Sequence, residues 1–136
     1  MAFGWAEFAK KMPGKTFTIA NAGGMSEFIP SFDVPSKMTD QVYHCNFSHL
    51  WNATATRHSD TIDTKFFVDG RTVIVGLAHT AFYEFRARTG RDITDREASY
   101  VAAEYLRERL EEEDEHALYD VPASDVTRLI GLLKLN

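Results

Sequence analysis

Cysteine is almost absent from this chain of 136 residues, in which Cys45 stands alone, so an internal disulfide is excluded. The start of the chain also lacks a charged segment followed by a short apolar stretch, the pattern of a secretory signal. No apolar run approaches the roughly 20 residues that a membrane-spanning helix needs. These absences predict a cytoplasmic protein that does not enter a membrane.

Basic residues are also too few to outnumber the acidic ones. Lys and Arg number 15 against 20 Asp and Glu, which gives a formal net charge of -5. Because nucleic-acid binding depends largely on neutralising phosphates with Lys and Arg, this balance disfavours a nucleic-acid partner. The net charge alone does not exclude a local basic site.

Complete catalytic and metal signatures are also missing. Residues 9–16 have the spacing of a phosphate-binding loop, but a helix-like run precedes them and a strand-like run follows, the reverse of the required order. Cys45 and His49 could share a zinc ion on a helix, whereas on a strand they stand roughly 13 Å apart at ~3.3 Å per residue. The alternation around them favours a strand. We therefore predict no metal site, no cofactor and no catalytic residue, and we recognise no family.

The composition of the chain is typical of a globular protein. Hydrophobic residues make up 44% and charged residues 26%, which is enough apolar side chain to build a core without disulfides. No shift in composition divides the sequence, and its length fits one unit. We predict a single domain over residues 1–136.

The strongest local signal is a β-hairpin over residues 64–77, in which Asp69-Gly70 joins two β-rich runs. A two-residue loop fixes the register of the strands. The predicted facing pairs on one side are Val68 with Arg71, Phe66 with Val73, Thr64 with Val75 and Ile62 with Leu77. On the other side they are Phe67 with Thr72, Lys65 with Ile74 and Asp63 with Gly76. The first side is almost wholly apolar and should face the core, while the second is a candidate binding surface.

Before the hairpin, the pattern predicts a helix over residues 2–12, an edge strand over 16–20, a long loop over 22–40 and a strand over 41–51. Period-2 alternation in the last of these places five residues on one side: Tyr43, Cys45, Phe47, His49 and Trp51. Together with the hairpin, this strand would form an antiparallel meander.

After the hairpin the period becomes helical. Thr80 or His79 can cap a helix that ends at Gly90, and Thr94 with Glu97 forms a capping box for a longer helix that reaches about His116. Residues 119–121 form a short extended piece. A last helix has apolar residues at helical spacing, namely Val126, Leu129, Ile130 and Leu133. The expected fold is a two-layer α+β domain with an antiparallel sheet of three or four strands, covered by the C-terminal helices.

Three functions are compatible with these features. The first is a regulatory or interaction protein without catalytic activity of its own, which binds a protein partner or a second copy of itself. It would use the loop 22–40, a basic cluster and an acidic run; the last two comprise Arg86, Arg88, Arg91 and Arg96, and Glu111, Glu112 and Glu113. The second is a small-molecule-binding protein or enzyme with a pocket lined by Tyr43, His49, Trp51 and His79. The third is nucleic-acid binding through the four arginines.

Overall fold

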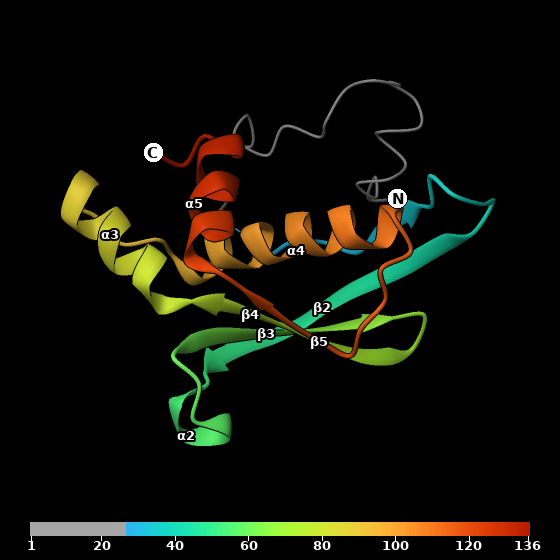
Figure 1. Ribbon diagram of the computed structural model, residues 1–136, viewed down its shortest axis with the longest axis horizontal. Helices are drawn as coiled ribbons and strands as arrows, with labels where there is room; N and C mark the ends of the chain where they lie inside the picture. Colours follow the sequence, from blue (N-terminus) through green and yellow to red (C-terminus); the bar gives the residue numbers. More distant parts are fainter. Residues whose placement is uncertain (1–26) are drawn as a thin grey trace.

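The computed structural model describes residues 27–136, which form a five-stranded sheet with its main helices on one face (Figure 1). The strands are β1 (Phe32–Pro35), β2 (Val42–Asn52), β3 (Thr61–Val68), β4 (Arg71–Ala78) and β5 (Leu118–Val121). The helices are α2 (Thr54–Arg57), α3 (His79–Thr89), α4 (Asp95–Glu111) and α5 (Ala123–Leu132). The predicted helix 2–12, the strand 16–20 and the loop-like stretch 9–16 lie outside the described residues.

The sheet is mixed, which corrects the prediction of three or four antiparallel strands. Its order is β1-β2-β3-β4-β5, and neighbours are antiparallel except β4 and β5, which run parallel. The extended piece predicted over 119–121 is this fifth strand. Strand β5 runs parallel to β4, an arrangement that needs a long crossover connection, and α3 and α4 provide that connection.

The hairpin of β3 and β4 is confirmed in every predicted pair, from Ile62 opposite Leu77 to Val68 opposite Arg71. Asp69 and Gly70 both have positive φ, at 50° and 82°. The side predicted to be apolar is the core side, where Phe66, Val68, Val73, Val75 and Leu77 are buried. The two-residue loop therefore sets the register of β3 and β4 as predicted.

Strand β2 departs from the predicted alternation at a β-bulge. Its pairing with β3 shifts between Phe47 and His49, so that one extra residue enters β2. Tyr43, Cys45 and Phe47 keep the core side, but His49 and Trp51 move to the opposite face of the sheet. The prediction of one continuous face was wrong because a bulge reverses which way the later side chains point.

The loop predicted over 22–40 contains a strand. Its described part, from residue 27 onward, includes β1, which pairs antiparallel with the start of β2. Phe32 and Val34 of β1 are buried in the core, and the backbone N–H of Ile29 donates to the Ser99 hydroxyl of α4 at 3.0 Å. The prolines and serines of this stretch predict a loop, but pairing with β2 and contacts with α4 stabilise a short strand.

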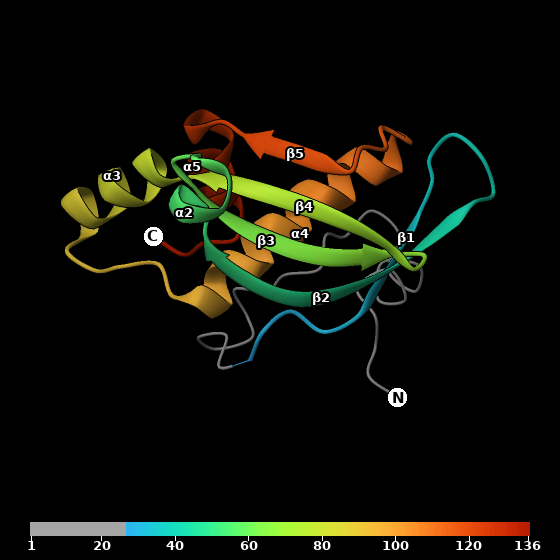
Figure 2. The ribbon, with the colours of Figure 1, turned by 90° about the horizontal axis from the view of Figure 1, so that it is seen from below.

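Helix α3 begins and ends at the predicted residues, and α4 begins at the predicted cap. Gly90 caps α3 with a φ of 82°, and Thr94 and Glu97 make both hydrogen bonds of the capping box at the start of α4. Helix α4 ends at Glu111 rather than near His116, as expected from acids at the negative end of the helix dipole. It runs across one face of the sheet and buries Val101, Ala102, Leu106 and Leu110 (Figure 2).

The opposite face of the sheet, called the outer face below, carries a clamp of three charged residues. Asp63 of β3 is 1% exposed. Arg57 lies at the end of α2. Its guanidinium donates two hydrogen bonds to the Asp63 carboxylate, at 2.7 Å and 2.9 Å, and one to the Asp120 carboxylate of β5, at 2.7 Å. The guanidinium lies above Gly76 of β4, where a Cβ would come within 2.5 Å of Nη2. Glycine is therefore required at this position for β3 and β5 to be bridged across β4.

Candidate functional site

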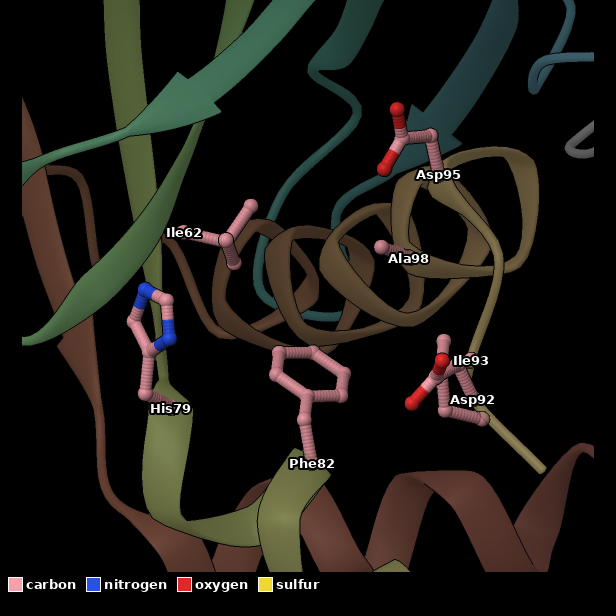
Figure 3. A pocket seen from close by; sticks show the side chains of 7 residues that line it. All are labelled: Ile62, His79, Phe82, Asp92, Ile93, Asp95 and Ala98. Atoms are coloured by element: carbon pink, nitrogen blue, oxygen red, sulfur yellow. The ribbon is translucent and has the colours of Figure 1, made fainter. Parts of the chain in front are cut away.

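A cavity of about 290 Å³ opens between the sheet and the first turns of α3 and α4 (Figure 3). His79 and Ile62 stand on one side, Asp92 and Ile93 on the other, and Phe82 closes a third side. Among residues 27–136, the lining consists of Ile62, His79, Phe82, Asp92, Ile93, Asp95 and Ala98. Four of these residues are apolar, and the other three, His79, Asp92 and Asp95, are ionisable.

The most unusual of these polar groups is His79, the first residue of α3. Its backbone N–H donates to the Asp60 carbonyl at 3.0 Å, which holds the start of the helix against the end of the β2–β3 connection. The side chain is buried, with 8% exposure, and Nδ1 lies 3.3 Å from the Tyr83 hydroxyl. Among the described residues nothing bonds to Nε2. Such an unsatisfied buried nitrogen costs about 1–3 kcal/mol.

Two carboxylates border the cavity, and their environments differ. Asp92 forms an ion pair with Arg86 at 2.7 Å, and both side chains are exposed. Asp95 is the first residue of α4, where a negative charge is favoured by the positive end of the helix dipole. Within residues 27–136, Asp95 makes no ion pair. Its carboxylate is therefore open to a ligand.

A second hollow of about 360 Å³ has Asp95 in common with the first. Its remaining lining residues are Phe28, Ile29, Phe47, Ser48, His49 and Leu50. The rings of Phe28 and Phe47 are stacked with centroids 5.4 Å apart. This hollow lies at the bulge of β2, beyond the last residue of that strand that pairs with β1. We call the two hollows together the cleft.

The four residues predicted to line one pocket are distributed over three places. Tyr43 is buried in the core, and its hydroxyl donates to Glu115 at 2.7 Å. Trp51 is on the outer face, with its indole N–H donating to Thr56 at 3.1 Å. The His49 ring lies against Trp51 at 5.0 Å on the outer face, although the residue also borders the second hollow, whereas His79 lines the first. The bulge separates residues that simple alternation had grouped.

The predicted basic cluster is engaged within the chain. Arg86 pairs with Asp92, and Arg91 forms two bonds with Glu97 at 2.9 Å and 3.1 Å. Two further members lie over phenyl rings, since Arg88 is 5.6 Å from the Phe85 centroid and Arg96 is 5.1 Å from that of Phe28. Binding of a partner by these arginines stays a prediction.

The predicted acidic run ties the end of α4 to the turn between β1 and β2. Glu111 pairs with Lys37 at 3.3 Å and with Arg107. Glu113 accepts hydrogen bonds from the Ser36 and Thr39 hydroxyls, which hold the pKa of its carboxyl below the usual value. Glu112 is the exposed C-cap residue of α4. Most of this run therefore has a structural partner.

Cys45 lies in the core, and burial raises the pKa of its thiol to about 12. At neutral pH it carries almost no thiolate, which is the nucleophilic form. It also points away from His49, because the bulge puts the two side chains on opposite faces. Across residues 27–136, no group of three or more His, Cys, Asp or Glu side chains is arranged to hold a metal ion.

Most residues of the cleft escaped prediction from the sequence. Phe82 is recognisable only as an apolar position of α3, and Asp95 only as part of a capping box. Ile62 was placed on the core side, which is correct, but nothing local shows that its position adjoins a cavity. The signal for such a site is the approach of α3 and α4, which the sequence does not display.

Comparison of the chain with protein-family models, with curated proteins and with solved structures found no match. In the part of the chain that the structure describes, every helix is too short or too polar to cross a membrane.

Proposed function

We propose that this protein binds a small, largely apolar molecule in the cleft, with one polar group of the ligand directed to His79. The observation that carries this proposal is the cavity of about 290 Å³, which is bordered by apolar side chains and by the ring of the buried His79.

The size and chemistry of the cleft support the same function. Its first hollow, about 290 Å³, is near the lower end of the range for small-molecule sites. A single-ring molecule needs about half of that, since cavities of about 150 Å³ hold benzene. Apolar walls with a few polar groups are the usual composition of such sites.

The test uses amide and histidine-ring NMR spectra of the full chain during titration with benzyl alcohol and, separately, toluene. Benzyl alcohol should shift the amides of Ile62, Ile93 and Ala98. Toluene should bind more weakly because it lacks the hydroxyl that can bond to His79. Shifts spread evenly over the surface, or none at saturation, would count against a binding site here.

Substitution of His79 separates a functional from a structural role. His79→Phe keeps an aromatic ring, although a larger one, and removes both the unsatisfied Nε2 and the Nδ1 that lies 3.3 Å from the Tyr83 hydroxyl. These effects oppose one another, so the free energy of unfolding should change by less than about 1 kcal/mol. The same variant should lose its preference for benzyl alcohol over toluene. His44→Phe is the matched control, because His44 is exposed and paired with Asp33 outside the cleft.

A second candidate function is protein binding through the outer face of the sheet. Trp51, Phe67 and Ile74 are half-buried there, and Leu118 is 43% exposed. Among the described elements only α2 packs on this face, whereas α4 and α5 lie on the other (Figure 1). Apolar side chains on an uncovered sheet face favour a protein partner or a second copy of the chain.

Sedimentation at rising protein concentration tests self-association, and capture from lysate tests a different partner. Leu118→Lys should weaken either association. Leu132→Lys is the matched control, since Leu132 is 46% exposed but belongs to α5, on the side of the sheet opposite the outer face. Equal effects of both variants would remove the outer face as the binding surface.

A further inference from the structure

Strand β2 has an open edge along its second half. Strand β1 pairs with β2 only from Val42 to Cys45, whereas β2 continues to Asn52 (Figure 2). In the part of the chain that the structure describes, no other strand pairs with β2 on this side. An open edge presents unpaired backbone N–H and C=O groups, and a strand of another chain can pair with them.

The pairing with β3 identifies the backbone groups that face the open edge. The N–H of Ala53 donates to the Thr61 carbonyl of β3, and in antiparallel pairing alternate residues face opposite sides. Asn52 and Leu50 therefore direct their N–H and C=O groups to the open edge. Ser48 is the extra residue of the bulge and has no facing residue in β3, which leaves it available to a strand on the other side.

The open edge is also uncharged. Residues 41–56 contain no Asp, Glu, Lys or Arg, and no other run in the chain without these residues is as long. Proteins usually protect edge strands from pairing by means of charged residues or proline. The two outermost strands follow this rule, since β1 contains Asp33 and Pro35, and β5 contains Asp120. Beyond its bulge, β2 lacks such protection.

We propose that this edge pairs with the same edge of a second copy of the chain, antiparallel and about a two-fold axis at Leu50. The paired stretch is Ser48–Asn52, because the strand ends at Asn52 and Leu50 is the centre of that stretch. Leu50 then faces its own copy, Ser48 faces Asn52, and His49 faces Trp51 of the second copy. A charged residue at the axis would meet its own charge, so an uncharged stretch is the kind that can pair with itself.

The side chains of this stretch suit such pairing. On the outer face, the His49 and Trp51 rings of one chain are 5.0 Å apart, and pairing places the same two rings of the second copy beside them. On the helix side, Leu50 is half-buried against the core and borders the second hollow. The Leu50 side chain of the second copy therefore extends an apolar lining. The first hollow and Leu118 take no part in this contact.

The test places charges at the two exposed positions that face each other between copies. Ser48→Lys with Asn52→Lys, and Ser48→Glu with Asn52→Glu, each create two like-charge pairs across the axis. Within one chain these positions are roughly 13 Å apart at ~3.3 Å per residue, so the charges act mainly between copies. Either variant alone should have a dissociation constant about tenfold higher than that of the original chain. A mixture of the two should associate at least as tightly as the original chain, because every pair is then of opposite charge.

Sedimentation of the full chain over about 0.01–1 mM measures the association, since an interface of this size is weak. Hydrogen exchange of the Leu50 and Asn52 amides, followed by NMR, should become slower as the protein concentration rises. Leu118→Lys is the control, because Leu118 lies on β5, away from this edge, and its replacement should leave the association unchanged. Unchanged amide spectra away from β2 show that the variants are folded.

Three results would overturn the inference. A chain that stays monomeric over this range has no such contact. Association that persists undiminished in both like-charge variants, or that Leu118→Lys abolishes, places the contact elsewhere. Amides of Leu50 and Asn52 that exchange slowly at every concentration mean that the edge is covered within one chain. Binding of benzyl alcohol in the first hollow depends on none of these results, so the proposed function is tested separately.

Discussion

Replacement of Gly76 by alanine tests the clamp on the outer face of the sheet. The new methyl carbon would lie 2.5 Å from Nη2 of Arg57 and 2.7 Å from Oδ1 of Asp63, whereas ordinary contacts begin at 3.4 Å. The guanidinium must therefore retreat by about 1 Å. That movement breaks the hydrogen bonds that Nη2 donates to Asp63 and Asp120.

The magnitude follows from these bonds. Each hydrogen bond to a charged group is worth about 1.5–3 kcal/mol, and the partly exposed Arg57 places the loss in the lower part of that range. Alanine regains about 0.5–1 kcal/mol over glycine in a strand. We therefore expect Gly76→Ala to lower the free energy of unfolding by about 2 kcal/mol, measured by urea denaturation.

Two further variants make this prediction specific. In an Arg57→Ala background the guanidinium bonds are already lost and the methyl group meets only the Asp63 and Asp120 carboxylates, so Gly76→Ala should cost clearly less than in the original chain. Gly131→Ala is the control, because its new carbon would meet nothing closer than 3.8 Å and helix α5 should gain up to about 1 kcal/mol. Equal costs of Gly76→Ala in the two backgrounds would refute the clamp.

Three other predictions concern stability. Thr94→Ala should lower the free energy of unfolding by about 1 kcal/mol, seen as an earlier urea midpoint, because it removes the side-chain half of the capping box. Folded protein should resist alkylation of Cys45 at pH 8, checked by mass spectrometry, and should react once urea unfolds it. Burial raises the pKa of this thiol from 9.0 to about 12, so between these values only the unfolded state loses the proton. Cys45 should therefore lower stability by up to about 1.4 kcal/mol per pH unit there. Buried tyrosines such as Tyr43, whose pKa is also raised, add to this fall, so Cys45→Ala should show a smaller slope rather than none.

The correctly predicted features are those that neighbouring residues determine. A two-residue turn at Asp69-Gly70 specifies the register of β3 and β4 without help from the rest of the chain. The capping box at Thr94 and the end of α3 at Gly90 likewise depend on bonds across three or four residues. The α+β class follows from such elements, since one strongly apolar side of a hairpin must be covered.

Features that join distant residues were missed or only partly seen. The facing pair of Asp63 and Gly76 was predicted, but the pattern did not indicate the Arg57 guanidinium above the glycine or its bond to Asp120, 63 residues away. The bulge in β2 was missed because apolar and polar residues continue to alternate through it in the sequence. In the structure, the extra residue turns the later side chains to the opposite face of the sheet. That single extra residue divided the predicted aromatic pocket.

The sequence by itself therefore determined the hairpin, the helix caps and the position of the core side, because each arises from local geometry and a short hydrophobic period. The tertiary structure alone decided the parallel placement of β5, the clamp across Gly76 and the cleft around Asp95. These depend on contacts between segments far apart in the chain, such as Ile29 with Ser99, 70 residues away. Such contacts stabilise the protein only after the chain has brought the segments together, so a pattern of neighbouring residues does not predict them.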